Sequence, residues 1–514
     1  MKKAKVIISI LIALVTVGAL TACGGGKEPV GSGSSSSQQG GVNTGREASN
    51  SVIVGMPQEL DSLDPHSAEG AGTREILFNL FEGLVKATPE GELEPAVASA
   101  YSMDDPTKIV FTLRDGIKFS DGSDVTAEDV KYSIERYADI QGKESAFSNL
   151  KDIVVADNGT IEILLNEPNS DFIYELTCAI IPKANDANVA TAPVGTGPFK
   201  FVSYTPGESL VVAKNENYWK EGRPYLDEVT FKLVEDTDTA VSMLKAGSLD
   251  VYHHLTVDQA STLGDSFNIL EGNENMVQAV FLNNGVAPFN DIRVRQAICY
   301  AIDRDMVNQM VFDGKSHLIG TNMIPSNETY YNADTEHVYD RDVAKAKELL
   351  AEAGQSNLTF TIRVPGDYQP HVDTAQIVKE NLAEAGVTAN IELVEWTTWL
   401  DDVYNGRNYQ ATIIAVDNRF LAPSTWMTKN ISTGANNFTN YSNPEFDATY
   451  QKALKETDQE TKVQLYNKLQ EILTNDAASA YIEDPAMLVA VNSDLEGYTF
   501  YPISAQDMSL VKYK

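Results

Sequence analysis

Apolar residues alternate with polar ones over residues 108–114. Alternation of this kind is typical of a strand with one buried face. The turn pair Asp115 and Gly116 follows directly, and the apolar positions Ile117 and Phe119 come after it. Two such runs joined by Asp-Gly predict a β-hairpin in this part of the chain.

A helix is predicted to begin just beyond this hairpin. Thr126 and Asp129 have the spacing of a capping box, with Asp in place of the usual Glu. The apolar residues Val130, Ile134 and Tyr137 then follow at helical spacing. The pattern therefore places a helix start at Thr126.

The second half of the chain alternates between helical and strand patterns. The expected elements are a helix over 342–353, a strand over 359–364, a helix over 374–385 and a strand over 391–394. Gly354 and Gly386 directly follow the two helices, and glycine is the preferred residue for a left-handed helix end. The β-α-β order implies that the two strands pair in parallel.

The length and composition indicate a large globular protein. The chain has 514 residues, of which 43% are hydrophobic and 22% charged. A chain of this size exceeds what a single hydrophobic core serves, so two or three compact lobes are expected. No repeat with a period of 20 to 50 residues is seen, which argues against a solenoid or propeller.

Residues 1–22 have the pattern of an export signal. Three lysines among the first five residues precede an apolar run over 6–20, about 15 residues long. This run is too short to span a membrane comfortably. It ends in Leu20-Thr-Ala-Cys23, which resembles the lipobox of bacterial lipoproteins, where cleavage leaves the cysteine to carry diacylglycerol. The alternative is an ordinary secretory signal with an incidental cysteine.

Residues 23–50 are rich in glycine and serine and show no apolar periodicity. Such a composition is typical of a flexible spacer, here a tether between the lipid anchor and the folded body. The other two cysteines, Cys178 and Cys299, lie in widely separated segments. We expect two buried thiols rather than a disulfide.

The strong negative charge excludes one class of partner. The formal net charge is −34, and loss of the three lysines of the export signal makes it about −37. Binding of nucleic acid needs clustered Lys and Arg, so nucleic acid is excluded as a partner. The acidity is interpreted as a well-solvated surface.

Several motifs resemble the large solute-binding proteins of peptide ABC importers, the oligopeptide and dipeptide receptors of extracellular solute-binding protein family 5. These motifs are Ser62-Leu-Asp-Pro-His66, Leu80-Phe-Glu-Gly-Leu84, the run 111–130, Gly195-Thr-Gly-Pro-Phe199, Asn217-Tyr-Trp219, Gly247-Ser-Leu-Asp250 and the run 288–297. The resemblance extends from about residue 51 almost to the C-terminus. Known relatives bind peptides, nickel chelates, haem or oligosaccharides.

The resemblance implies an α/β fold of the periplasmic-binding-protein type, with two lobes, an extra subdomain and a ligand cleft between the lobes. Lobe I is expected to comprise 51–85, 194–270 and 486–514, the extra subdomain II 86–193, and lobe III 271–485. Closure of the lobes over a ligand is a hinge motion.

The function implied is that of a lipid-anchored, monomeric binding protein without a cofactor. It would capture small peptides in the cleft and deliver them to the permease and ATPase subunits of an ABC importer. Its place would be the outer face of the bacterial cytoplasmic membrane, on the periplasmic side if an outer membrane is present. The alternatives are a receptor of the same fold for a non-peptide ligand, and a surface sensor or adhesin.

Asp417 is the candidate for binding the α-ammonium group of a peptide. It follows the apolar strand pattern over 412–416, and Trp396 lies upstream at nearly the spacing seen in peptide receptors. The alternative is a turn former or helix cap. The next residues, Asn418 and Arg419, only loosely match the family, and Arg419 either accepts a ligand carboxylate or neutralises Asp417.

Glu69, Gly70 and Ala71 look like the edge segment whose main chain pairs with bound peptide in oligopeptide receptors. The alternative is an ordinary surface loop. Among the tryptophans Trp396, Trp399 and Trp426, at least one is expected to form a wall of the cleft, although Trp399 also fits a core position.

Tyr481 and Glu483 precede the expected return of the chain to lobe I, a region that faces the cleft in relatives. Glu483 would then select cationic ligands. The alternative is a solvated acid, because an acidic residue is a weak signal in so acidic a chain.

Two other function classes find little support. The sequence has no Gly-x-Ser-x-Gly or His-Glu-x-x-His motif, and Gly314-Lys-Ser316 lacks the upstream glycine of a phosphate loop because position 309 is Gln309. No enzymatic activity is therefore expected. The neighbours His253 and His254 would point to opposite faces of an extended chain, so no metal site is predicted.

Overall fold

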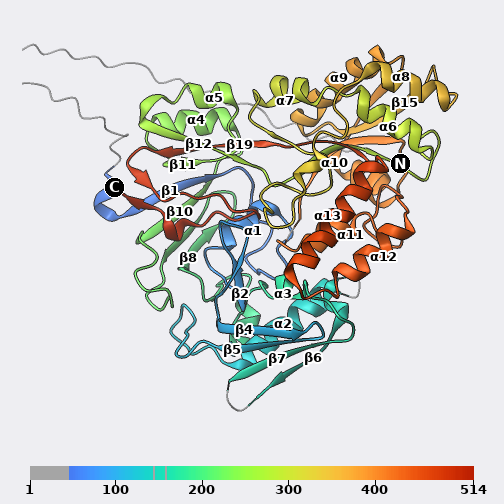
Figure 1. The fold of residues 1–514 in the computed structure, drawn as a ribbon. Helices are drawn as coiled ribbons and strands as arrows, with labels where there is room; N and C mark the ends of the chain where they lie inside the picture. The colour runs from blue at the N-terminus through green and yellow to red at the C-terminus, as the bar shows by residue number, and fades with distance from the viewer. Residues whose placement is uncertain (1–44, 143–144, 157–158, 419) are drawn as a thin grey trace, which may run out of the picture. The chain divides into compact units, whose positions relative to one another are not determined.

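The computed structural model describes residues 45–142, 145–156, 159–418 and 420–514 (Figure 1). All of them belong to the second of two units into which the chain divides, Gly40–Lys514. The predicted export signal, Cys23, most of the tether and Arg419 lie outside the described residues. No helix in the described part has the length and apolar character needed to cross a membrane.

A seven-stranded sheet combines strands from both ends of the chain. Its order is β12-β19-β11-β1-β10-β9-β8, with β1 (Ser51–Met56), β8 (Phe199–Thr205), β9 (Ser209–Lys214), β10 (Glu228–Leu233), β11 (Val251–Tyr252), β12 (Phe267–Asn273) and β19 (Ala486–Asn492). β1 lies at the centre and pairs in parallel with β10 and β11. In β19, Leu488 and Ala490 join the core beneath helices α4 (Thr237–Lys245) and α5 (Val257–Ser261), while Val489 and Val491 join the core of the opposite face. The strand alternation therefore buries both faces of the sheet.

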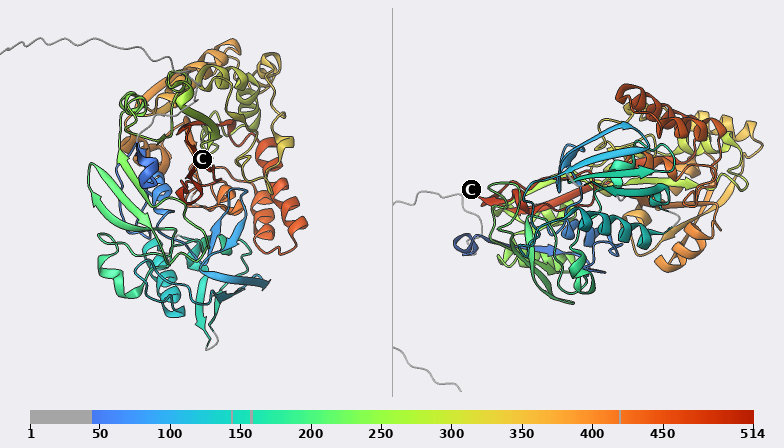
Figure 2. Two further views of the ribbon diagram at one scale, coloured as in Figure 1. Left: turned by 90° about the vertical axis from the view of Figure 1, so that its left-hand side faces the viewer. Right: turned by 90° about the horizontal axis from the view of Figure 1, so that it is seen from below.

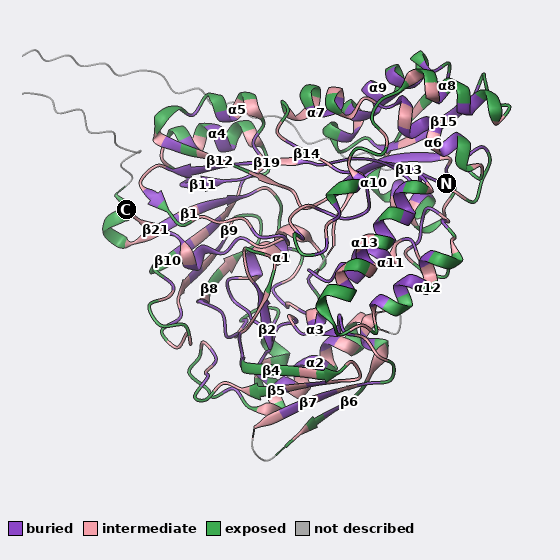
Figure 3. Cartoon of the chain, in the orientation of Figure 1, coloured by how far each residue is buried: buried purple, intermediate pink, exposed green. Residues whose placement is uncertain are grey.

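A six-stranded sheet is built from one continuous stretch of the chain. Its order is β14-β18-β13-β17-β15-β16, with β13 (Val277–Leu282), β14 (His317–Leu318), β15 (Thr359–Pro365), β16 (Thr388–Val394), β17 (Ala411–Val416) and β18 (Ala480–Asp484). One face is covered by α6 (Ile292–Ala301), α7 (Arg304–Phe312), α8 (Val343–Glu352) and α9 (Gln369–Glu384). The other packs against α11 (Pro423–Thr428), α12 (Pro444–Ala453), α13 (Gln459–Asn475) and a π-helix at Trp399–Asn405. In Figure 3 the central strand β13 is purple, whereas the edge strand β8 is mostly pink and green.

The β-α-β prediction for this half is confirmed. β15 and β16 pair in parallel along their whole length. Gly354 follows α8 with φ 70°, and Gly386 follows α9 with φ 84°, the left-handed geometry expected at the two helix ends.

The third sheet has the order β4-β5-β7-β6 and is antiparallel throughout, with β4 (Ala98–Asp105), β5 (Lys108–Leu113), β6 (Leu150–Val155) and β7 (Thr160–Leu165). Helix α2 (Ala127–Gln141) packs on it, and Thr126 and Asp129 form the predicted capping box. In the left-hand view of Figure 2 these cyan and teal elements gather at the bottom.

The remaining elements are short. They are α1 (Ala71–Leu77), α3 (Phe172–Glu175), α10 (Trp396–Thr398), β2 (Val85–Ala87), β3 (Leu93–Pro95), β20 (Leu495–Glu496), β21 (Lys512–Tyr513) and 3-10 turns at Arg46–Ser49, Ala146–Asn149, Lys183–Asn188, Gly264–Ser266, Ala333–Thr335 and Met508–Leu510. The strands of the three larger sheets follow the predicted lobes closely, although β12 continues past residue 270. The boundaries of the lobes stay a prediction.

The predicted hairpin after residue 108 is wrong. β5 pairs with β4 on one side and with β7 on the other, so both of its edges are already occupied. Asp115 and Gly116 do form the turn, with Gly116 at φ 69°. The buried residues Ile117 and Phe119 then leave the sheet and pack in its core. The two cysteines are buried as expected: Cys178 lies in this core, Cys299 lies in a core of the six-stranded sheet, and they are not bonded to each other.

A buried carboxylate joins the part of the chain that contains the third sheet to the helices of the six-stranded sheet. Asp171, at the start of α3, forms an ion pair with Lys462 of α13. Its second oxygen accepts hydrogen bonds from the hydroxyl of Tyr466, at 2.5 Å, and from the backbone N–H of Ser424, at 3.2 Å. Both charged side chains are almost completely buried, so removal of either leaves an uncompensated charge.

We predict that Asp171→Ala lowers the free energy of unfolding by about 3 kcal/mol, because Lys462 then stays buried without a counter-charge. The urea midpoint followed by tryptophan fluorescence measures this loss. The exposed Asp124, which pairs with Lys118, provides the matched control, and Asp124→Ala is expected to cost less than about 1 kcal/mol. Equal midpoints for the two variants would show that the buried pair does not join these elements.

Candidate functional site

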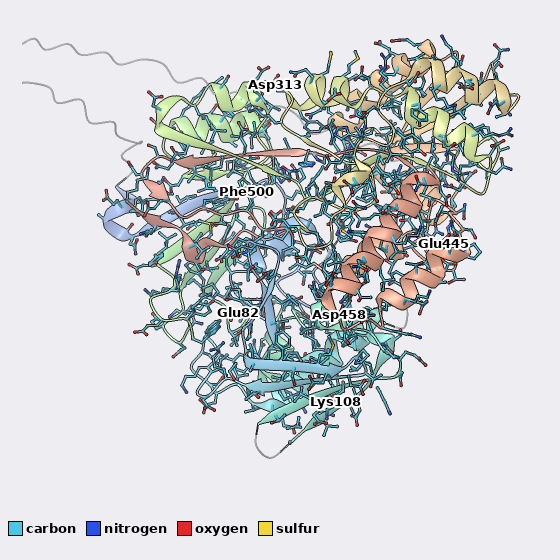
Figure 4. All side chains as sticks on the ribbon, viewed as in Figure 1. Glu82, Lys108, Asp313, Glu445, Asp458 and Phe500 are labelled. Atoms are coloured by element: carbon cyan, nitrogen blue, oxygen red, sulfur yellow. The ribbon has the colours of Figure 1, made fainter. Side chains whose placement is uncertain are left out.

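A cavity of about 1110 Å³ lies where the seven-stranded and six-stranded sheets meet. From the side of the seven-stranded sheet it is lined by residues 57–58, 69–72, 74–75, 253–258, 498–501 and 503–506. From the side of the six-stranded sheet it is lined by residues 310–313, 370–371, 414–415, Lys315, Tyr368, Trp396 and Asp417. Figure 4 labels one lining residue from each side, Phe500 and Asp313.

The chain crosses between the two sheets at the back of this cavity. The first crossing, residues 274–276, joins β12 to β13, and the second is Pro485, between β18 and β19. The backbone N–H of Glu274 donates to the carbonyl oxygen of Pro485 at 2.8 Å. Figure 1 shows the red strands β18 and β19 passing from one sheet to the other. Two short crossings bonded side by side are the kind of connection that serves as a hinge.

Asp417 lies in the cavity, directly after β17. Its carboxylate is 38% exposed and forms an ion pair with Arg74 of α1, at 3.3 Å between Oδ2 and Nη2. On the other side, the ammonium of Lys429 donates to the backbone carbonyl of Asp417. Burial lowers the pKa of Lys429 to about 8, although the charge of Asp417 acts in the opposite direction. The carboxylate of Asp417 thus faces the cavity with one basic side chain beside it and another behind it.

The sequence analysis did not name Arg74. It sits one helical turn beyond Ala71, and the guanidinium also donates to the carbonyl oxygen of Glu69. The only feature of the sequence that pointed to Arg74 as a cavity residue was its i, i+3 spacing from Ala71. Neutralisation of Asp417 was expected from Arg419, which lies outside the described residues.

Glu69, Gly70 and Ala71 line the cavity, but much of their main chain is already hydrogen-bonded. The N–H groups of Glu69 and Gly70 both donate to Asp61, at 2.7 and 3.1 Å. Gly70 caps α1, and its carbonyl oxygen accepts from the N–H of Arg74. A strand-like pairing with a peptide would need these bonds to break, so this segment is a wall of the cavity rather than an open edge.

Trp396 forms an aromatic wall. It is 36% exposed and lines the cavity, with Tyr368 packed edge-on at 5.4 Å between ring centroids. Behind it the ring of Trp399 is stacked nearly parallel, at 5.3 Å and 6°. Trp399 is only 2% exposed, and its indole N–H donates to Thr412, so it occupies the core position proposed as its alternative. Trp396 is therefore a rigid surface supported by the core.

The other candidates within the described residues do not line the cavity. Trp426 is buried in the core under α11, and Asn418 follows Asp417 without reaching the cavity lining. Tyr481 and Glu483 are buried within β18, and burial raises the pKa of Glu483 to about 8. Glu483 is thus neither ligand-facing nor a solvated acid, because β18 is flanked by β13 and β14 and covered on both faces.

His253 and His254 line the cavity on the same side, contrary to expectation. His254 has φ 60°, so the backbone is not extended there, and the two ring centroids lie 4.3 Å apart. Nδ1 of His254 lies 2.7 Å from Oε1 of Glu274. Burial disfavours the charged form of His254, but the charge of Glu274 and this hydrogen bond outweigh it and raise the pKa to about 9. His254 is therefore a cation at neutral pH.

Glu75 completes this cluster from α1. Burial and the charge of Glu274 raise the pKa of Glu75 to about 7, although His254 and Arg74 oppose the shift. For His253, burial and the charge of His254 lower the pKa well below its usual value, so its ring is neutral. No group of three or more His, Cys, Asp or Glu among the described residues has an arrangement that could hold a metal ion.

Comparison with known proteins places the chain in a family. Residues 92–438 match the family model for bacterial extracellular solute-binding proteins, family 5 middle region. The glutathione-binding protein GsiB of Salmonella typhimurium is 26% identical over 479 residues, covering 88% of this chain and 93% of the relative. GsiB of Escherichia coli K12 matches to the same extent.

Solved structures agree in fold. The substrate-binding protein CtaP of Listeria monocytogenes superimposes with a TM-score of 0.81 at 23% identity, covering 90% of this chain and 99% of that one. The binding protein DppA of Helicobacter pylori, in complex with the peptide STSA, gives 0.75 at 25% identity, covering 90% and 98%. The two-sheet α/β arrangement is thus the periplasmic-binding-protein fold predicted from the motifs. The chain belongs to the bacterial extracellular solute-binding proteins of family 5, which are non-enzymatic binding proteins that act outside the cytoplasm.

Proposed function

We propose that this protein captures short peptides in the cavity, with the peptide α-ammonium bound at Asp417, and delivers them to a membrane permease with its ATPase. The observation that carries the proposal is the carboxylate of Asp417, which is part-exposed to the cavity at the end of a buried strand. A charge-assisted hydrogen bond from an ammonium to such a carboxylate contributes about 1.5 to 3 kcal/mol.

The surroundings of Asp417 suit an ammonium group. Arg74 meets only one side of the carboxylate, at the long distance of 3.3 Å, and the carboxylate stays 38% exposed. A ligand ammonium can therefore approach from the cavity without displacing Arg74. Lys429 keeps the backbone at Asp417 in place from behind, so the carboxylate is held ready for the ligand.

The size and walls of the cavity suit a peptide. A volume of about 1110 Å³ lies above the range of about 300 to 1,000 Å³ that is usual for small-molecule pockets. Trp396 offers a flat apolar wall for ligand side chains. Similar structures named for peptide ligands include DppA of H. pylori and the murein tripeptide-binding protein MppA.

We predict that Asp417→Asn weakens the binding of the tripeptide Ala-Ala-Ala by about 10- to 150-fold, because Asn removes the charge and retains an acceptor oxygen. Isothermal titration calorimetry measures the change. The exposed Asp115, in a turn remote from the cavity, gives the control, and Asp115→Asn is expected to bind as the wild type does.

N-acetylated Ala-Ala-Ala tests the same contact from the ligand side. It should bind weakly to the wild type and no more weakly to Asp417→Asn, since both changes remove one ion pair. Tight binding of the acetylated peptide to the wild type would contradict the ammonium role of Asp417. Binding of a metal chelate or sugar and of no peptide would contradict the peptide assignment.

We further propose that a lipid on Cys23 anchors the protein to the outer face of the cytoplasmic membrane. The support is the sequence alone: the apolar run, the small residues before Cys23 and the glycine- and serine-rich stretch after it. This stretch would serve as the tether between the lipid and the folded body, which could then meet a permease while anchored.

Cys23→Ser is expected to move the protein from the membrane fraction into the medium or periplasm and to abolish its labelling with a palmitate analogue. Fractionation of the producing bacterium followed by immunoblotting is the measurement. Ser36→Ala, within the tether, should leave both properties unchanged. Membrane retention of Cys23→Ser would argue against lipidation at this residue.

A further inference from the structure

We propose that Glu75, Glu274 and His253 form a second polar subsite of the cavity that binds a cationic group of the ligand, so that the preferred peptides carry a lysine- or arginine-like side chain. The inference rests on the proposed function, since it assigns a substrate class to the same cavity. The subsite lies beside the crossing at residues 274–276 and contains none of the residues that hold the α-ammonium.

Two carboxylates are available in this subsite. Glu274 uses Oε1 to accept from His254, and the structure records no hydrogen bond to its other carboxylate oxygen among the described residues. The side chain of Glu75 likewise has no recorded hydrogen bond there, although it lines the cavity and interacts electrostatically with His254 and Glu274. With His254 charged and Glu75 ionised, these three groups carry a net charge of −1, which a single ligand cation neutralises.

His253 gives independent support for a ligand at this place. It is only 4% exposed and lines the cavity, yet neither ring nitrogen has a hydrogen-bond partner among the described residues. Its recorded contacts are ring contacts with Tyr252 and His254. The neutral ring has one donor nitrogen and one acceptor nitrogen, and both are left available on the cavity side. A ligand N–H group beside the two carboxylates would satisfy that acceptor.

The charge of the whole lining favours a cation over an anion. Among the described residues, six carboxylates line the cavity: Glu69, Glu75, Asp258, Glu274, Asp313 and Asp417. In the same part of the chain, the two lining cations with permanent charge are Arg74, which pairs with Asp417, and Lys315, which pairs with Glu271 outside the cavity. Even with His254 protonated, the lining keeps an excess of negative charge, and a cleft lined by one sign of charge concentrates ligands of the other.

The direction of the pH dependence of binding distinguishes a cationic ligand group from an anionic one. Glu75 faces His254, Glu274, Arg74 and Tyr498, and its pKa of about 7 means that about half of it is protonated at neutral pH. A ligand cation stabilises the ionised form and lowers this pKa, so binding releases a proton and tightens as pH rises from about 6 to 8. A ligand anion would take up a proton and bind more weakly over the same range.

The test compares the tripeptides Ala-Lys-Ala and Ala-Ala-Lys with their norleucine counterparts, whose side chains have the four carbons of lysine without its ammonium group. By titration calorimetry on the folded protein at pH 7.5, at least one lysine peptide is expected to bind about tenfold or more tightly than its norleucine counterpart. Glu75→Gln and Glu274→Gln should each reduce this preference, and Glu75→Gln should also flatten its pH dependence.

Asp313→Asn is the matched control, since Asp313 lines the same cavity outside the subsite and asparagine tolerates its positive φ of 57°. It should retain the preference for lysine. Because Glu75 has no recorded side-chain hydrogen bond, Glu75→Gln should fold. This variant alone then tests whether the subsite causes the lysine preference, even if Glu274→Gln is unstable.

Equal affinity for lysine and norleucine peptides would overturn the subsite and leave the peptide function intact. Tighter binding of Ala-Glu-Ala than of Ala-Lys-Ala would overturn it in favour of an anionic group. Failure of all these peptides to bind would overturn both the subsite and the proposed function.

Discussion

The hydrogen bond between Glu274 and Pro485 marks the constraint on which the rest of the structure depends: the chain enters and leaves the six-stranded sheet at one place. The helices and strands from β13 to β18 pack around that sheet, and both ends of this stretch connect to β12 and β19, which are neighbours in the other sheet. Two sheets whose chain connections both lie at one place enclose a space between them. The cavity lies at this space, and its back wall is formed by the crossings themselves.

The charges of the cavity follow from that arrangement. Asp417 and Lys429 come from the side of the six-stranded sheet, whereas Arg74, Glu75 and His254 come from the other side. The pair of Arg74 and Asp417 therefore links the two sides across the cavity at 3.3 Å. A ligand that binds between the two sides adds further contacts of the same kind, which is how a hinge protein couples ligand binding to closure.

The sequence predicted elements whose signals are local. The capping box at Thr126 and the glycines at positions 354 and 386 set helix ends through contacts within a few residues, and all three are found where expected. The parallel pairing of β15 and β16 followed from the single helix between them. The hairpin after β5 failed because β7, about 50 residues away, takes the edge that the local pattern assigned to residues 117–119.

Sequence reasoning identified the cavity residue that directly follows a strand. It missed cavity residues whose position depends on irregular backbone or on distant elements. Asp417 lies at the end of β17 and lines the cavity, as the strand pattern and the resemblance to peptide receptors together implied. Glu483 belongs to a strand covered on both faces, which a short apolar run does not reveal. His254 lines the cavity because its own backbone is left-handed, which no sequence pattern indicated. Arg74 lines the cavity because α1 lies against a strand that is distant in the sequence.

Native mass spectrometry of residues 45–514, purified from bacteria grown in rich medium, tests most directly whether the cavity holds peptides. The account predicts extra mass that dissociates on activation and sequences as a mixture of short peptides, enriched in lysine and arginine. A single bound species that proves to be a metal chelate, a haem or a sugar would contradict it.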